Sequence, residues 1–309
     1  MATTSSFPYS YIRKKICETE EATVSIQCKA IQYGLGVFTG IRGNYNPKKK
    51  NLYLFRMEDH FQRLVEAAKI TGMKFAYSYA EFKKIIIDLV KKNDIKEDIY
   101  IRPTLYAAST KLTPRFDNED DDLAIYIISL KNYFDTKKGL NVCISSWRRF
   151  DDDTISTKAK VTGGYANSAL AKTEAIQNGY DEALFLNRDG KVCEASGANI
   201  FAIKNGTIYT PPLSANNLNG ITRRSLLEIF SKELNLQVRE EEIDRSMLYT
   251  YDELFLTGTA AKIAWISHVD KRKTGKGEQG PITKKIQKLF NEITAGDNKK
   301  YSKWLTPIF

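Results

Sequence analysis

The segment from residue 157 to residue 201 constrains the fold more than any other part of the sequence. It reads TKAKVTGGYANSALAKTEAIQNGYDEALFLNRDGKVCEASGANIF. A Gly-Gly turn precedes a predicted helix that begins near Asn167 and ends at Gly179. A predicted hairpin follows, with strands at residues 181–186 and 191–196 joined by a four-residue turn.

Two charged side chains of this segment are chemically meaningful as a pair. Lys160 comes just before the Gly-Gly turn, and Glu194 lies in a strand of apolar and small residues. A lysine amine can form a Schiff base with the aldehyde of pyridoxal phosphate, and a carboxylate can keep the pyridine nitrogen of that cofactor protonated. The glycines allow a tight turn and admit a flat ring. Taken singly, each residue is equally well explained as a solvated surface charge.

The motifs around this pair resemble those of the fold-type IV pyridoxal-phosphate aminotransferases, and most of all the branched-chain amino acid aminotransferases. In chain order they are YGLGVFTGIR, FRMEDHFQRL, YIRP, SSW, KVTGGY, EASGANIF, LNGITRRSL and FLTGTAAKI. The resemblance extends from about Tyr33 to about Leu289. It implies an α+β or α/β fold of two mixed domains joined by a short interdomain loop, with the site in the cleft between them. The expected limits are 1–130 for a smaller N-terminal domain, 131–138 for the loop, and 139–309 for a larger domain that carries the cofactor lysine.

The resemblance also implies a role for each site residue. Lys160 would be the catalytic Schiff-base lysine, and Glu194 the partner of the pyridine nitrogen. The other implied cofactor contacts are Arg63, Tyr165, Leu218, Ile221, Thr222 and Thr259. The implied substrate contacts are Tyr33, Phe38, Arg42, Tyr100, Arg102, Thr259 and Ala260. Among these, the resemblance gives Arg63 and Thr259 to the cofactor phosphate and Arg102 to the side-chain carboxylate of glutamate or 2-oxoglutarate.

Several of these residues have simpler explanations in their local patterns. Arg63 falls away from the apolar stripe of its predicted helix, so it could be a solvated arginine paired with Asp59. Arg102 shares one face of its predicted strand with Tyr100, which is compatible with a structural ion pair. Backbone amides at a helix start attract anions, and Thr222 could equally be a plain N-cap.

The remaining predicted elements follow from hydrophobic periodicity and turn residues. Residues 22–31 alternate apolar and polar and are predicted to form a strand. Helices are predicted at about 58–70, 79–92 and 282–294, with a further amphipathic helix after residue 222. Strands are predicted at 51–55, 99–107, 123–130, 141–147, 199–204 and 207–210.

Composition excludes several other classes of protein. The formal net charge is +10, but the basic runs lie in predicted loops and helix ends without interleaved aromatic residues, which indicates a solvated surface rather than a nucleic-acid site. The four cysteines are scattered and form neither a disulfide framework nor a metal motif. No apolar run approaches the roughly 20 residues of a membrane span, and no secretory signal is recognised. A cytoplasmic protein without metal is expected.

The implied reaction is transamination between leucine, isoleucine or valine and 2-oxoglutarate by a homodimer or larger homo-oligomer. Three positions depart from the usual bacterial pattern: Thr39 stands where glutamate is common, Gln32 where histidine is common, and Gly164 where asparagine is common. The interdomain connection is also short, with Tyr133 or Phe134 as substitutes for a tryptophan. These departures concern the substrate rather than the catalytic groups.

Three kinds of alternative stay open from the sequence. The alternatives that share the same fold are a D-amino acid aminotransferase, an (R)-amine aminotransferase and an aminodeoxychorismate lyase. A non-catalytic basic binding protein is an alternative of another class. A hydrolase is disfavoured because no GxSxG motif occurs and the chain has only two histidines.

Overall fold

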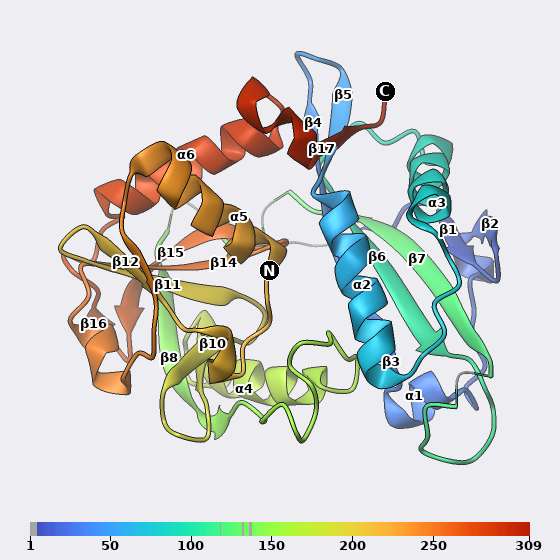
Figure 1. Ribbon diagram of the computed structural model, residues 1–309, viewed down its shortest axis with the longest axis horizontal. Coiled ribbons are helices and arrows are strands. Elements are labelled where there is room, and N and C mark those ends of the chain that lie inside the picture. Colours follow the sequence, from blue (N-terminus) through green and yellow to red (C-terminus); the bar gives the residue numbers. More distant parts are fainter. Residues whose placement is uncertain (1–4, 118, 132, 136–137) are drawn as a thin grey trace. The chain divides into compact units, whose positions relative to one another are not determined.

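A computed structural model of the protein describes residues 5–117, 119–131, 133–135 and 138–309 (Figure 1). Residues 132, 136 and 137 of the predicted interdomain loop therefore lie outside the described residues. None of the described helices is long and apolar enough to cross a membrane. Within the same ranges, no group of three or more histidine, cysteine or acidic residues could hold a metal ion.

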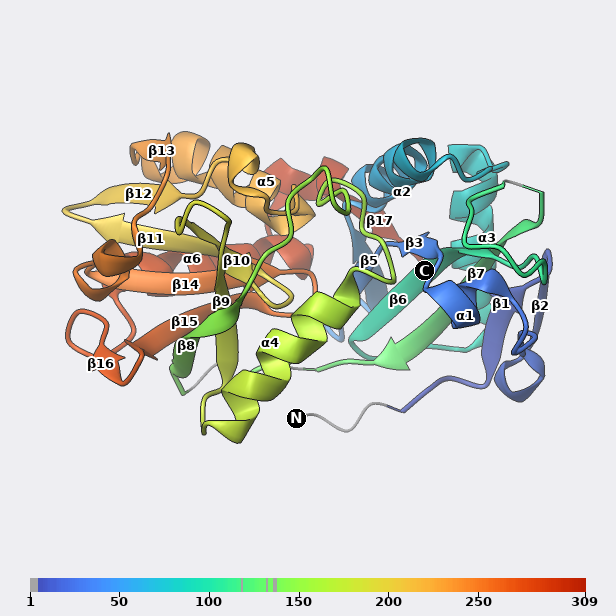
Figure 2. The same cartoon turned by 90° about the horizontal axis from the view of Figure 1, so that it is seen from below.

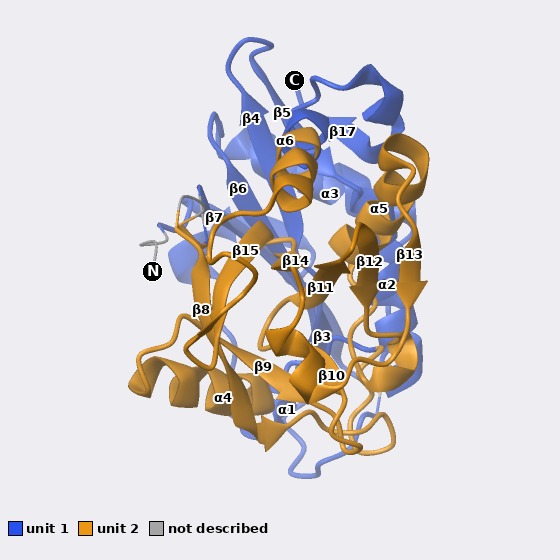
Figure 3. Cartoon of the chain, turned by 90° about the vertical axis from the view of Figure 1, so that its left-hand side faces the viewer, with its two compact units in different colours: residues 1–133, 159–163, 290–309 blue, residues 134–158, 164–289 orange. Residues whose placement is uncertain are grey.

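The chain forms two compact units, coloured separately in Figure 3. Unit 1 comprises residues 1–133, 159–163 and 290–309, and unit 2 comprises residues 134–158 and 164–289. The first boundary falls inside the predicted connection, but the units are discontinuous in sequence, whereas the predicted domains are contiguous. Lys160 therefore belongs to unit 1 rather than to the C-terminal part of the chain.

Unit 1 is built on one antiparallel sheet. Its elements are β1 (Tyr9–Ile12), β2 (Lys15–Glu18), α1 (Lys29–Tyr33), β3 (Gly36–Phe38), β4 (Ile41–Asn46), β5 (Asn51–Phe55), α2 (Met57–Thr71), α3 (Tyr79–Lys92), β6 (Ile99–Ala107), β7 (Asp121–Ser129) and β17 (Leu305–Pro307), with short 3₁₀ helices at Thr19–Glu21 and Lys299–Trp304. The strand order is β17-β5-β4-β6-β7-β1-β2, and β3 also pairs with β6.

Helices α2 and α3 cover one face of this sheet (Figures 1 and 2). A capping box starts α3, because the Ser78 side chain accepts the Glu81 amide and the Glu81 carboxylate accepts the Ser78 amide. Gly72, with φ of 74°, ends α2 in the left-handed conformation. Apolar residues of both helices and of β6 and β7 form a single buried core. Both helices and the strand at 99–107 are confirmed.

Unit 2 is built on a second sheet with mixed pairing. Its elements are β8 (Leu140–Arg148), α4 (Tyr165–Gln177), β9 (Glu182–Leu186), β10 (Val192–Ala195), β11 (Asn199–Lys204), β12 (Thr207–Thr210), α5 (Ile221–Ile229), β13 (Val238–Glu240), β14 (Glu253–Gly258), β15 (Lys262–Val269) and β16 (Arg272–Lys273), with a π-helix at Phe230–Leu234 and 3₁₀ helices at Leu213–Ala215 and Arg245–Tyr249. Helix α6 (Pro281–Thr294) starts in unit 2 and ends in unit 1. The strand order is β10-β9-β8-β15-β14-β11-β12-β13, and β16 pairs with β15.

Alternation along the strands of unit 2 separates two apolar faces. One cluster includes Val142 of β8 and Leu254 of β14. Cys143 and Cys193 belong to another cluster, with Ala171 of α4. Burial raises the pKa of the Cys143 thiol to about 11.

Two parts of unit 1 differ from the sequence prediction. The strand predicted at 22–31 is wrong: the chain turns irregularly to Cys28 and then forms α1, which ends at Gly34 with φ of 68°. Lys29 is fully buried in α1 and forms an ion pair with Asp117. The C-terminal tail, for which the sequence indicated no element, adds β17 to the sheet beside β5.

Candidate active site

The segment that carries Lys160 is paired with the stretch from Gly34 to Phe38 in unit 1. The Phe38 amide donates to the Lys160 carbonyl at 3.0 Å, and the Thr162 amide donates to the Gly36 carbonyl at 2.8 Å. A Cβ on Gly34 would lie 2.8 Å from the Cα of Gly163, so this approach requires glycine. A Cβ on Gly163 would in turn lie 3.2 Å from the Gly34 carbonyl oxygen, so the Gly-Gly turn packs closely against this backbone, a role that the sequence interpretation did not include.

Phe38 contacts two cationic side chains. The Nζ atom of Lys160 lies 5.0 Å from the centroid of the Phe38 ring. The guanidinium carbon of Arg102 lies 4.3 Å from the same centroid and 5.1 Å from that of Tyr100. The Arg102 Nε–H also donates to the Tyr100 hydroxyl at 3.2 Å. These four predicted residues thus form one cluster, which we call the Phe38 cluster.

Gly40 provides the space for the Tyr100 side chain in this cluster. A Cβ placed on Gly40 would overlap the Tyr100 hydroxyl and the adjacent ring carbons. Tyr100 itself is 7% exposed. The glycine of the FTGIR motif is therefore explained by the position of the Tyr100 ring.

Arg63 is a buried residue of α2 and not a solvated one. It is 8% exposed, and its Nη2 donates to the Thr39 hydroxyl at 2.9 Å. The Thr39 hydroxyl also lies 2.9 Å from Nδ1 of His60, one helical turn before Arg63. Asp59, the suggested partner of a solvated Arg63, instead forms an ion pair with Arg56 at 2.8 Å. The buried guanidinium is suited to an anionic ligand such as a phosphate.

Arg42 and Tyr33, two other predicted substrate contacts, have different surroundings. Arg42 on β4 is 3% exposed; its Nη2 donates to the carbonyl of Lys131 and lies 3.6 Å from the Asp98 carboxylate. Burial lowers the pKa of the Arg42 guanidinium, and Asp98 opposes this shift. Tyr33 is the half-buried last residue of α1.

Glu194 lies in unit 2 among three donors. Its carboxylate is 3.1 Å from the Arg149 guanidinium, accepts the Leu218 amide at 3.1 Å, and accepts the Asn199 side-chain amide at 3.3 Å. Glu194 is 5% exposed, so its acid is buried with its partners. The pairing of β10 with β9 is irregular between Val192 and Ala195, and such an irregularity re-aims the side chains that it includes.

The start of α5 provides amides close to the Glu194 partners. Gly220 is the N-cap, with no side-chain hydrogen bond to the first turn, and Thr222 is the second helical residue. The plain N-cap interpretation of Thr222 is therefore wrong. A Cβ on Gly220 would overlap the Asn199 side-chain oxygen, while the Asn199 amide donates to the Leu218 carbonyl at 2.9 Å. Ile221 and Thr222 are both buried, and such a helix start is suited to an anion.

The other predicted residues of unit 2 lie at element ends. Tyr165 is the first residue of α4 and is half-buried. Thr259 and Ala260 follow β14, in the turn that leads to β15, and both are half-buried. Tyr133 is 47% exposed, whereas Phe134 packs against the unit 2 core.

Sequence reasoning missed four residues that contact the predicted site: Arg149, Thr39, His60, and Asn199, whose side-chain amide donates to Glu194. Arg149, which pairs with Glu194, follows the SSW motif closely, and a charge at the end of a strand was the available signal. Thr39 was noted only as a departure from a pattern. His60 is separated from Arg63 by one turn of the same helix, a spacing that places both side chains on the same side.

Comparisons with known proteins agree on the family. The family model described as Amino-transferase class IV matches residues 36–269. A probable branched-chain-amino-acid aminotransferase of Aquifex aeolicus is 44% identical over 304 residues, which cover 98% of each chain.

Two solved structures extend the agreement to the fold. The branched-chain aminotransferase of the thermophilic archaeon Thermoproteus uzoniensis with norvaline is 38% identical and has a TM-score of 0.94, with coverage of 99% of this chain and 100% of that chain. The branched-chain amino acid aminotransferase of Thermobaculum terrenum in its PLP-form is 34% identical and has a TM-score of 0.93, with coverage of 98% of this chain and 99% of that chain. The chain therefore belongs to the class IV aminotransferase family and has a fold-type IV architecture. The two solved structures are of branched-chain aminotransferases, and the Aquifex aeolicus relative is named as a probable one.

Proposed function

We propose that the protein is a pyridoxal-phosphate-dependent branched-chain amino acid aminotransferase. It moves the amino group of leucine, isoleucine or valine to 2-oxoglutarate, which yields glutamate and a branched 2-oxo acid. The observation that carries this proposal is similarity to branched-chain aminotransferases over almost the full length of the chain. D-amino acid and (R)-amine aminotransferases, and a non-catalytic binding protein, have no support among the relatives named above.

The donor set of the chain fits pyridoxal phosphate. Arg63 is a buried guanidinium, and the amides of Ile221 and Thr222 start a helix that no side chain caps. Guanidinium groups and helix starts are both common phosphate ligands. Lys160 offers an amine for the aldehyde, and Glu194 a buried carboxylate for the ring nitrogen. Thr259 and Tyr165 are proposed as further cofactor contacts.

The chemistry follows from these groups. When bound, the cofactor supplies an aldehyde carbon for the amino group and a ring that accepts electrons from the substrate Cα. Lys160 would be the base that takes the proton from the substrate Cα and delivers it to the cofactor carbon that carries the amino nitrogen. Arg149, Asn199 and the Leu218 amide hold the Glu194 carboxylate in one orientation.

The Phe38 cluster explains how one pocket could accept two unlike side chains. Phe38 offers an apolar surface to a branched aliphatic chain. Arg102, held by Phe38 and by the Tyr100 hydroxyl, offers a guanidinium to the side-chain carboxylate of glutamate. We assign the substrate α-carboxylate to the backbone amides of Thr259 and Ala260. Tyr33 and Arg42 are proposed as outer residues of the same pocket.

We also propose a cytoplasmic homodimer that needs no metal ion, nucleic acid or membrane. The four cysteines are all free and buried, which suits a reducing compartment. The stoichiometry rests on the resemblance, and light scattering of the purified protein would measure it.

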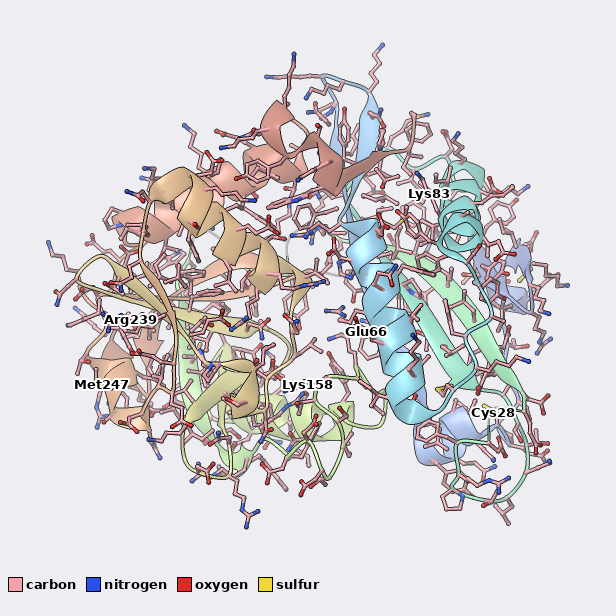
Figure 4. All side chains as sticks on the ribbon, in the orientation of Figure 1. Cys28, Glu66, Lys83, Lys158, Arg239 and Met247 are labelled. Carbon is pink, nitrogen blue, oxygen red and sulfur yellow. The ribbon has the colours of Figure 1, made fainter. Side chains whose placement is uncertain are left out.

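Absorbance of the purified protein tests the proposal. The lysine-bound cofactor should absorb at the violet edge of the spectrum, and Lys160→Ala should abolish both that band and transamination. Lys158→Ala is the matched control: Lys158, labelled in Figure 4, comes two residues before Lys160, and its amine donates to the Leu213 carbonyl at 2.6 Å. A wild-type protein that takes up no pyridoxal phosphate, or a Lys160→Ala variant with normal turnover, would refute the enzyme assignment.

A substrate panel tests the particular activity. Leucine, isoleucine, valine, D-alanine and (R)-phenylethylamine would each be offered with 2-oxoglutarate as acceptor. The three branched L-amino acids should be the preferred donors. Preference for D-alanine or the amine would overturn the branched-chain assignment while leaving the family assignment intact.

A further inference from the structure

Buried hydrogen bonds link Arg63 to Thr39 and His60, two residues without an assigned role toward the cofactor. Thr39 connects β3 and β4 and is fully buried, and its backbone amide donates to the Pro103 carbonyl at 3.0 Å. Its hydroxyl lies 2.9 Å from Nη2 of Arg63 and 2.9 Å from Nδ1 of His60. Nη2 and Nδ1 are 3.5 Å apart, so the three polar atoms form a compact triangle.

One direction in this triangle follows from the chemistry of the groups. An arginine can only donate, so the Thr39 oxygen accepts from Arg63. The Thr39 hydroxyl has one hydrogen and a second lone pair, so it donates to Nδ1 of His60 or accepts from it according to the imidazole tautomer. In both cases the contact with His60 fixes the direction of the Thr39 hydroxyl.

We propose that Thr39, supported by His60, is a positioning residue that orients the Arg63 guanidinium for the phosphate of the cofactor. This proposal rests on the proposed function. The five N–H donors of a guanidinium lie in one rigid plane, so fixing the direction of one of them fixes the others. A guanidinium can bind a phosphate by two parallel hydrogen bonds only in the right direction. If the Arg63 side chain had to be ordered when the phosphate binds, the protein would bind the cofactor less tightly.

The position of Thr39 in the chain supports this role over a packing role alone. Its amide fixes the backbone on β6, and its neighbour Phe38 contacts Lys160. A side chain that served only to fill space would not need its hydroxyl directed toward two polar groups of α2. Valine has nearly the shape of threonine without the hydroxyl, and serine keeps the hydroxyl without the methyl group. The two substitutions therefore separate hydrogen bonding from packing.

The test measures affinity of the apoprotein for pyridoxal phosphate and for pyridoxal, which lacks the phosphate. Thr39→Val should weaken pyridoxal phosphate binding by about tenfold or more, since hydrogen bonds to charged groups contribute that much. Its affinity for pyridoxal should change by less than about twofold, because the lost contact acts on the phosphate alone. Thr39→Ser should bind both ligands within about threefold of the wild type.

Equal loss of affinity for both ligands, or a Thr39→Ser variant as weak as Thr39→Val, would overturn the positioning role. A wild-type protein that binds neither ligand would instead refute the proposed function. Should Thr39→Val fail to fold, the His60 pair makes the same comparison. His60→Asn keeps an acceptor near the Nδ1 position and should retain phosphate-dependent affinity, whereas His60→Leu should lose it; equal affinities in the two variants would overturn the proposal.

Discussion

The guanidinium carbon of Arg102 lies 4.3 Å from the centroid of the Phe38 ring. An aromatic face attracts a cation through its quadrupole, so this contact restricts where the guanidinium can point. The Lys160 amine is 5.0 Å from the same centroid, which places the polar end of the proposed substrate pocket and the reactive amine against one side chain. Phe38 is therefore more than an apolar wall for a branched substrate.

Replacing Phe38 by leucine should impair the use of 2-oxoglutarate more than the use of leucine. The cation–π contact contributes about 0.5–2 kcal/mol, so KM for 2-oxoglutarate should rise by about 2- to 30-fold. Leucine keeps an apolar surface for the branched donor, whose KM should change less. Steady-state kinetics with each substrate varied in turn would measure both values. Phe38→Tyr, which keeps the ring, is the matched control, and equal losses for the two substrates in Phe38→Leu would contradict the role given to this contact.

Gly40→Ala should displace the Tyr100 ring and with it the hydrogen bond from Arg102. The new Cβ would overlap the Tyr100 hydroxyl, so one of the two segments must move. Tyr100→Phe removes only the 3.2 Å bond to Arg102, and it should raise KM for 2-oxoglutarate by about tenfold at most. Gly40→Ala should have the larger effect on the same constant.

Thermal unfolding of both variants would show whether Gly40→Ala acts on the site or on the fold. The prediction requires that Gly40→Ala raises KM for 2-oxoglutarate while the variant still unfolds cooperatively on heating. A Gly40→Ala variant with wild-type kinetics would show that the Tyr100 position is not needed for 2-oxoglutarate.

Local patterns were sufficient to predict many elements and insufficient for contacts across the chain. The bounds of α3 and β6 follow from apolar periodicity, and a capping box marks the start of α3. The strand predicted at 22–31 was wrong, and Lys29 in this stretch forms its ion pair with Asp117, which is 88 residues away and beyond the reach of a local pattern. Strand β17 depends on pairing with β5, some 250 residues earlier in the sequence, and no local pattern encodes such pairing.

The same distinction holds for the candidate site. Lys160 and Glu194 were recognisable because each lies in a local motif of glycines or small residues. The partner of Glu194 was not, because Arg149 comes from the end of a different strand of the sheet. Buried Arg63 likewise donates to Thr39, which the helix pattern around Arg63 does not include. Sequence reasoning therefore missed the residues that contact a functional side chain from a different helix, strand or loop.

The ion pair between Lys29 and Asp117 should make stability depend on pH in the acid range. The hydrogen bond from Lys29 lowers the pKa of the Asp117 carboxyl. A lowered pKa in the folded state stabilises the fold above the unfolded pKa of about 3.9, and this contribution is lost as pH falls through the folded value. Asp117→Asn leaves the fully buried Lys29 charge without its carboxylate, so the variant should be less stable than the wild type at pH 7.

Urea denaturation of both proteins between pH 7 and pH 3 would test this linkage. The gap between their midpoints should be largest at pH 7 and should begin to shrink below about pH 4, the unfolded pKa of an aspartate, because protonation of the unfolded carboxyl removes the advantage of the lowered folded pKa. Lys29→Met combined with Asp117→Asn should show a smaller loss at pH 7 than Asp117→Asn alone, because no buried charge is left unpaired. A gap that stays constant with pH would contradict the assignment.

Trp304→Ala should destabilise unit 1 and the start of α2 in particular. Trp304 is 6% exposed, and its ring centroid lies 6.0 Å from that of Phe55. The guanidinium carbon of Arg56 lies 4.6 Å from the Trp304 ring centroid. The Arg56 amide donates to the Trp304 carbonyl at 2.6 Å, and Arg56 is the N-cap of α2 in a left-handed conformation with φ of 48°. Removing a buried tryptophan side chain costs about 3–5 kcal/mol.

Because α2 carries His60 and Arg63 within its first two turns, the loss should reach the proposed phosphate ligand. The denaturation midpoint should fall, and pyridoxal phosphate affinity should fall with it even at temperatures where the variant is folded. Trp304→Phe keeps an aromatic ring against Arg56 and should lose less of both quantities, while Phe309→Ala removes a half-exposed side chain from the same tail and should change neither by much. A Trp304→Ala variant with a lowered midpoint but unchanged cofactor affinity would show that the C-terminal tail stabilises the sheet without acting on α2.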